Sequence, residues 1–205
     1  MPGGVAITWF SHGSWGLVSP EGVRIVVDPW FAAPTTPPGT APEADVILVT
    51  HGHFDHILGV AELAEASGAE VTMPEGERFL LERAQEFTPP GIAIRAWVPE
   101  VGVEGGETLE RCGLVFEVLS VPGHSPAHVA YLVDGVLLSG DVLFHGSVGR
   151  TDFPGSDWPT LLASIESLVE RLPPETPVLP GHGEPTTLGA ELASNPFLGP
   201  LRERR

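Results

Sequence analysis

The chain has 205 residues, of which 42% are hydrophobic and 18% are charged, a balance typical of a folded domain. Its 27 acidic residues outnumber 10 basic ones, none of them lysine. The net charge of −17 repels phosphate backbones and argues against a nucleic-acid partner. The single cysteine, Cys112, excludes an intrachain disulfide and a zinc site built from several cysteines.

No apolar run approaches the roughly 20 residues that span a bilayer, and the N-terminus lacks the pattern of a signal peptide. We therefore expect a cytoplasmic protein without a membrane partner. The length favours one domain over residues 1–205. The oligomeric state is left open.

The first third of the chain is rich in β-forming segments that Gly and Pro separate. The expected strands are Val5–Phe10, Trp15–Ser19, Arg24–Asp28 and Val46–Thr50. A Pro- and Thr-rich stretch over 29–42 has no helical period, so we expect a loop there.

Apolar residues at helical spacing follow, and we expect helices at Ile57–Ser67, Gly76–Glu86 and Asp157–Leu172, the last with Asp157 as its N-cap. Short strands are expected at Glu70–Met73 and Thr176–Leu179. Most of 92–139 reads as strand and turn, with a hairpin at Asp134-Gly135 and another turn at Cys112. Strands and helices thus occur twice in a similar order, which predicts two facing β-sheets with helices outside.

The run from His51 to His56 places four potential metal ligands within six residues, directly after an expected strand. On a loop at the end of that strand, His51, His53, Asp55 and His56 can all turn toward one point. The alternative is a solvated polar turn. The chain has only eight histidines, so chance clustering explains this run poorly.

Three further ligand-type residues each follow an apolar strand and stand beside Gly, where the backbone can approach a metal closely. These residues are His124, Asp141 and His182. Together with the first run they make seven candidate ligands: His51, His53, Asp55, His56, His124, Asp141 and His182.

This pattern resembles the metallo-β-lactamase superfamily. Residues 46–198 are similar to short, single-domain glyoxalase II-like hydrolases, through Pro122-Gly-His-Ser-Pro, Gly140-Asp141, the Gly149-Arg150-Thr-Asp-Phe153 run, Pro180-Gly-His-Gly183 and Asn195-Pro-Phe-Leu198. The first 45 residues are more similar to lactonase-like members. The resemblance implies an α+β class with a four-layer αββα fold, in which two facing mixed β-sheets carry outer helices.

The resemblance also implies a ligand arrangement. His51, His53 and His124 would hold one divalent ion, Asp55, His56 and His182 would hold the other, and Asp141 would bridge them. Zn is the metal expected first, and Fe or Mn suits the same donors. Water activated between the two ions would attack a small-molecule acyl thioester, with Asp55 and Asp141 as the catalytic residues.

Three residues are candidates for substrate contacts. Arg150 could meet a substrate carboxylate or anchor its own loop through Asp152. His145 lies near a ligand loop, and His12 could approach the mouth of the site. His128 is a further candidate partner for the ligands. The lack of lysine and the acidic charge predict weak affinity for a glutathione conjugate.

Three other readings remain open. The N-terminal resemblance favours a lactonase or another ester hydrolase. The Gly149–Phe153 run is similar to persulfide dioxygenase-like enzymes, which use a single iron. The non-enzyme alternative is a metal-stabilised binding domain. True zinc β-lactamases often have Cys at the place of Asp141, which argues against that activity.

Overall fold

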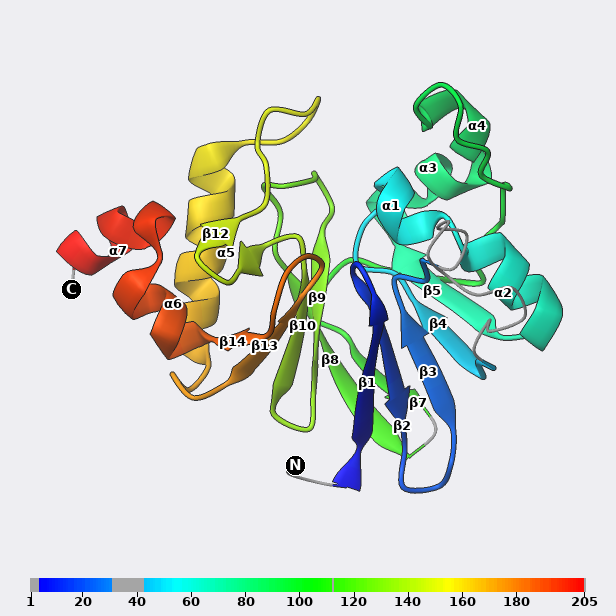
Figure 1. Cartoon of the computed structure of the whole chain (residues 1–205), viewed down its shortest axis with the longest axis horizontal. Helices are drawn as coiled ribbons and strands as arrows, with labels where there is room; N and C mark the ends of the chain where they lie inside the picture. The colour runs from blue at the N-terminus through cyan, green and yellow to red at the C-terminus, as the bar shows by residue number, and fades with distance from the viewer. Residues whose placement is uncertain (1–3, 31–42, 112, 205) are drawn as a thin grey trace.

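Two six-stranded β-sheets face each other, and helices cover the outer face of each (Figure 1). The computed structural model describes residues 4–30, 43–111 and 113–204. The loop expected at 29–42 therefore lies almost wholly outside the described residues, and so does Cys112 with its expected turn. No helix among the described residues is long and apolar enough to cross a membrane.

The first sheet follows chain order, β1-β2-β3-β4-β5-β6, antiparallel at β1 to β3 and parallel from β3 onward. Its strands are β1 Ala6–Ser11, β2 Ser14–Val18, β3 Arg24–Val27, β4 Val46–Leu48, β5 Glu70–Pro74 and β6 Val101–Val103. The four strands expected before residue 51 are all present, with ends shifted by one or two residues.

The second sheet has the order β14-β13-β10-β9-β8-β7, with one parallel pair, β10 with β13. Its strands are β7 Thr108–Arg111, β8 Leu114–Ser120, β9 Val129–Val133, β10 Val136–Gly140, β13 Pro177–Pro180 and β14 Thr186–Thr187. The predicted hairpin joins β9 to β10, with Asp134 at a φ of 51°. A small hairpin of β11 Leu143–Phe144 and β12 Ser147–Val148 was not anticipated.

Side-chain alternation along the strands builds three apolar layers. In β3, Ile25 and Val27 belong to the core between the sheets, whereas Val26 belongs to the core under the first set of helices. In β10, Leu138 faces the other sheet and Leu137 faces the helices of the second sheet. A strand buried on both faces reads as a continuous apolar run. The predicted αββα layering is confirmed.

Two expected helices are broken into shorter ones. The predicted helix at Ile57–Ser67 is α1 Phe54–Ile57 followed by α2 Val60–Ser67, because Gly59 between them has a φ of −96° and a ψ of 0°. The predicted helix at Gly76–Glu86 is a 3₁₀ turn, Glu75–Glu77, then α3 Arg78–Glu82 and α4 Ala84–Phe87. Helix α3 ends at Glu82, because the next residue, Arg83, has a non-helical ψ of 35°.

The long helix near the C-terminus begins as expected. Helix α5, Trp158–Arg171, has Asp157 as its N-cap, whose side chain accepts a hydrogen bond from the Thr160 N–H at 2.9 Å. Helices α6 Leu188–Ser194 and α7 Gly199–Glu203, which the sequence did not indicate, also pack on the second sheet.

Candidate metal centre

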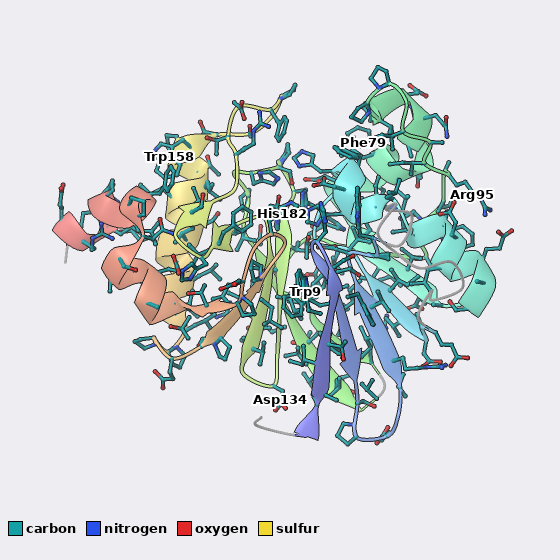
Figure 2. The ribbon with its side chains drawn as sticks, viewed as in Figure 1. Trp9, Phe79, Arg95, Asp134, Trp158 and His182 are labelled. Carbon is teal, nitrogen blue, oxygen red and sulfur yellow. The ribbon has the colours of Figure 1, made fainter. Side chains whose placement is uncertain are left out.

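Each candidate ligand lies just beyond the end of a strand, at one edge of the sandwich. His51 and His53 follow β4, and Asp55 and His56 sit on α1 directly after them. The other three ligands follow β8, β10 and β13, in that order His124, Asp141 and His182. Figure 2 shows His182 between the two sheets at this edge. The sandwich therefore gathers segments that are up to 131 residues apart.

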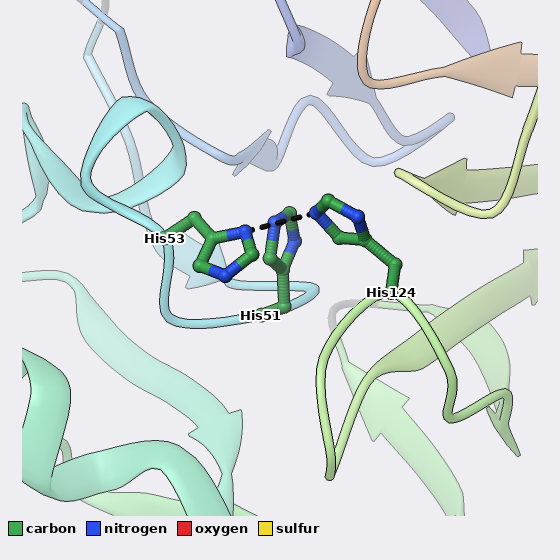
Figure 3. Close-up of side chains that lie close together, drawn as sticks. All are labelled: His51, His53 and His124. Carbon is green, nitrogen blue, oxygen red and sulfur yellow. Dashed lines mark hydrogen bonds between the residues drawn. The ribbon is translucent and has the colours of Figure 1, made fainter. Parts of the chain in front are cut away.

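The ligand atoms fall into overlapping groups in which all atoms lie within 4.8 Å of one another. One group is His51, His53 and His124 (Figure 3), another is Asp55, His56 and His182, and a third joins His51 and His56 to Asp141. The Asp141 Oδ2 atom is 3.3 Å from His182 Nε2 and 3.5 Å from His124 Nε2. Asp141 thus reaches both of the first two groups.

Hydrogen bonds away from the centre fix which ring nitrogen each histidine presents to it. His51 Nδ1 donates to Thr50 Oγ1 at 3.1 Å, and His56 Nδ1 donates to Asp28 Oδ2 at 2.9 Å. His124 Nδ1 donates to the Arg150 carbonyl at 2.8 Å. These contacts assign the proton to Nδ1, so the Nε2 lone pair of each ring faces the centre.

Three of the inward-facing atoms are buried and have no hydrogen-bond partner among the described residues. They are His51 Nε2, His56 Nε2 and Asp141 Oδ1; the last two lie 3.3 Å apart as a close ion pair but without hydrogen-bond geometry. Buried polar atoms in proteins nearly always have a partner. A metal ion held by these lone pairs would satisfy all three atoms, so the donor set fits the metals implied by the sequence.

The electrostatics of the histidine-rich group favour neutral ligands. Burial lowers the pKa of His51 well below its usual value and that of His53 to about 4. Burial also lowers the pKa of His124. Because only a neutral imidazole can donate a lone pair to a metal, these rings are ready to bind at neutral pH.

The second group attracts positive charge. Hydrogen bonds from His182 to Asp141 and Asp55 raise the pKa of His182 to about 9. Burial opposes the charge of Asp141, yet His56 and His182 beside it hold its pKa well below the usual range. The carboxylates of Asp55 and Asp141 therefore favour a positive charge in this group.

Two residues that position the ligands had no role in the sequence interpretation. Asp28, with a φ of 48°, accepts hydrogen bonds from Thr50 N–H at 2.8 Å and Thr50 Oγ1 at 2.7 Å, besides the one from His56. One carboxylate therefore orients His56 directly and His51 through Thr50. The only sequence signal was an acidic residue at the end of an apolar strand.

Glu77 is the second such residue, with 1% of its surface exposed. Its Oε2 accepts a hydrogen bond from Gly52 N–H at 2.6 Å, and its Oε1 accepts one from Ala127 N–H at 2.8 Å. Glu77 thus joins the loop that carries His51 and His53 to the loop that follows His124. The sequence around Glu77 contains no motif that would have identified it as a residue that positions the ligands.

The glycines beside the ligands allow close backbone approach, as expected. A Cβ atom on Gly181 would lie 2.0 Å from Asp141 Oδ1 and 2.8 Å from His56 Cε1. A Cβ on Gly149 would lie 1.9 Å from the Asp141 carbonyl oxygen. No side chain fits at either position while the ligands keep their places.

A cavity of about 740 Å³ opens on the ligand cluster, with His53, Asp55, Asp141 and His182 in its wall. Arg150 also lines the cavity, but its guanidinium is engaged with Asp152 at 2.9 and 2.7 Å. Of the two roles left open for Arg150, the structure shows the loop contact.

The other candidate substrate contacts lie outside the lining of this cavity. The His145 side chain is 66% exposed, and its Nδ1 lies 3.6 Å from Glu191. His12 is exposed, stacks on Trp30 and meets the edge of His182 with ring centroids 5.7 Å apart. His128 is buried, and its Nε2 accepts a hydrogen bond from the Asp141 N–H at 3.1 Å.

An αββα sandwich with His and Asp ligands at one edge defines a metallo-hydrolase class, and comparison with known proteins places the chain within it. The metallo-β-lactamase superfamily model matches residues 8–182. Hydroxyacylglutathione hydrolase GloC of Haemophilus influenzae is 40% identical over 161 residues, 75% of each chain. The chain belongs to the metallo-β-lactamase superfamily, and the predicted glyoxalase II-like relationship is confirmed.

Two crystal structures are similar over nearly the whole chain. BLEG-1, described as a B3 metallo-β-lactamase, is 32% identical with a TM-score of 0.80, over 91% of this chain and 93% of that one. TTHA1623, solved in a di-iron-bound form, is 36% identical with a TM-score of 0.72, over 97% of this chain and 100% of that one.

Proposed function

We propose that this protein hydrolyses acyl thioesters with two divalent metal ions. The observation that carries the proposal is a pair of ligand groups that both lie close to Asp141 and that open on one cavity. Seven ligands are too many for one tetrahedral ion. The hydroxyacylglutathione hydrolase relative, which acts on a thioester by its name, favours a thioester as substrate.

The proposed roles follow the grouping of the side chains. His51, His53 and His124 would hold one ion, and Asp55, His56 and His182 would hold the second. Asp141, which lies close to both groups, would contact both ions. Bound ions of this kind would lower the pKa of a bound water to about 7 and polarise a carbonyl oxygen. Imidazole and carboxylate donors suit Zn, Fe and Mn, and the di-iron form of TTHA1623 makes iron a candidate beside zinc.

The protein's own groups orient the reactants. The Asp55 carboxylate is partly exposed to the cavity, where it can accept a hydrogen bond from an attacking water. Asp28 and Thr50 hold His56 and His51 so that their Nε2 atoms keep facing the centre. A thiolate leaves readily because the pKa of a thiol is near 8.5, so the site needs no strong general acid.

The test combines metal analysis with a substrate panel. Protein reconstituted separately with Zn, Fe and Mn is assayed for metal content and for turnover of thioesters, lactones and β-lactams. We expect close to two ions per chain and metal-dependent thioester hydrolysis. β-Lactams belong in the panel because of the similarity to BLEG-1.

Each alternative has its own outcome. Turnover of lactones without any thioester hydrolysis would make the protein a lactonase. A limit of one iron per chain with oxidation of persulfides would favour the mononuclear dioxygenase. Full metal occupancy without turnover of any compound would favour a binding domain.

A further inference from the structure

The cavity beside the ligand cluster has an apolar wall built from separate elements. Five phenylalanines line it, from α1, α3, α4, the β11–β12 hairpin and the loop before α5: Phe54, Phe79, Phe87, Phe144 and Phe153. The polar side chains in the lining are those of five candidate ligands, of Ser125, of Arg150 and of Glu77, which is already engaged with two backbone N–H groups.

Several of these rings are incompletely covered. Phe79, Phe87 and Phe153 are 43%, 46% and 37% exposed. The rings of Phe79 and Phe87 meet edge to face with centroids 5.3 Å apart, so they form one continuous apolar surface. Figure 2 shows Phe79 at the same edge of the sandwich as His182. Aromatic surface left open beside a reactive centre is typical of a ligand pocket.

Among the described residues that line the cavity, no cation is left unpaired for an anionic substrate. Arg150 is the only arginine among the described residues that line it, and Asp152 engages its guanidinium through two nitrogens while the group lies 4.5 Å over the ring of Phe153. The guanidinium of Arg83 lies 5.5 Å over the ring of Phe87, and Glu86 engages it at 3.0 Å. The chain has no lysine and carries a net charge of −17. Glutathione has two carboxylates and one ammonium group, so its conjugates arrive with net negative charge and find no unpaired guanidinium there.

We propose that the substrate is a thioester of an uncharged, apolar acyl group on an uncharged thiol, with the acyl group against Phe79, Phe87 and Phe153. This inference rests on the proposed thioesterase function and narrows its substrate class. The ligand cluster would act on the carbonyl of the thioester, and the three phenylalanines would determine which acyl group binds beside it.

A panel of four thioesters tests the acyl group and the thiol of the substrate independently. They combine a lactoyl or a phenylacetyl group with glutathione or with the neutral thiol N-acetylcysteamine. Burying a phenyl ring favours binding by roughly 10- to 100-fold. We expect phenylacetyl-N-acetylcysteamine to have a kcat/KM at least about 30-fold above that of lactoylglutathione. Lactoylglutathione as the best of the four would overturn the inference.

A matched pair of variants tests the wall itself. Phe87 and Phe197 are both 46% exposed, and each meets one aromatic neighbour edge to face, but Phe197 packs on Trp158 away from the cavity. We expect Phe87→Ala to raise KM for the phenylacetyl thioesters about 5-fold or more and to leave the lactoyl thioesters within about 2-fold. We expect Phe197→Ala to leave all four unchanged. Equal effects of the two variants would contradict the proposed contact.

Non-hydrolysable thioethers separate this inference from the proposed function. The phenylethyl thioethers of N-acetylcysteamine and of glutathione are titrated calorimetrically into metal-loaded protein. Tighter binding of the neutral thioether, without hydrolysis of any thioester, would refute the thioesterase function and keep the apolar pocket. Equal binding, or tighter binding of the glutathione thioether, would overturn the inference whatever the enzyme hydrolyses.

Discussion

We expect Glu77 to stabilise the fold and the group of candidate ligands formed by His51, His53 and His124. Its carboxylate is the common acceptor for Gly52 N–H and Ala127 N–H, and these donors belong to different ligand loops. In Glu77→Ala both donors lose their acceptor. In Glu77→Gln the side chain keeps one acceptor oxygen, but its NH₂ group faces the other N–H, so one hydrogen bond is necessarily lost.

The magnitude follows from the cost of an unpaired buried donor, which is about 1–3 kcal/mol. We expect Glu77→Ala to lower the free energy of unfolding by about 3 kcal/mol. We expect Glu77→Gln to lower it by about 1–2 kcal/mol. For a chain of this size each kcal/mol shifts Tm by about 2–4 °C. Metal affinity should fall mainly at His51, His53 and His124, because Glu77 joins the loops that carry them.

The assay is urea unfolding of metal-free protein together with metal titration of each variant. Glu62→Gln is the control, because Glu62 is an exposed glutamate on α2. We expect the control to match the unchanged protein and the alanine variant to lose more stability than the glutamine variant. A glutamine variant as stable as the unchanged protein, with both metal sites intact, would refute the reasoning.

Four further outcomes concern the centre. Reconstituted protein should bind close to two ions per chain, and chelation should lower its Tm; a firm limit of one ion by elemental analysis would rule out the dinuclear site. Asp141→Ala should abolish hydrolysis in a folded chain, and Asp141→Asn should be nearly as damaging, since the amide lacks the charge that attracts both ions; circular dichroism and metal content check this, and retained kcat would contradict it. Asp28→Asn should weaken metal binding about 10- to 100-fold by releasing His56, which a competition titration measures; unchanged affinity would remove its positioning role. Gly181→Ala should displace Asp141 or His56 and lower metal occupancy, and a crystal structure with both ligands in place would disprove the steric argument.

The sequence predicted the layers better than the individual helices. Apolar runs such as Val46–Leu48 remain strands in the fold, because a strand buried on both faces needs an apolar side chain at every position. The break at Gly59 was not predicted from the apolar period, which continues across it. The Gly59 N–H donates to the Pro29 carbonyl at 2.9 Å, a contact with a distant part of the chain, and periodicity does not carry that information.

The sequence by itself determined which residues are candidate ligands, because His and Asp in a tight run and at strand ends are a local, chemically specific signal. Tertiary structure alone decided how those ligands are held. Asp28 reaches Thr50 and His56 across 22 and 28 residues, and Glu77 reaches Ala127 across 50. It also decided that Arg150 pairs with Asp152, a choice the sequence left open. Which residues can bind a metal follows from the chemistry of each side chain, and the sequence gives the side chain at every position. Hydrogen bonds between distant loops exist only after the two sheets have packed and brought those loops to one edge.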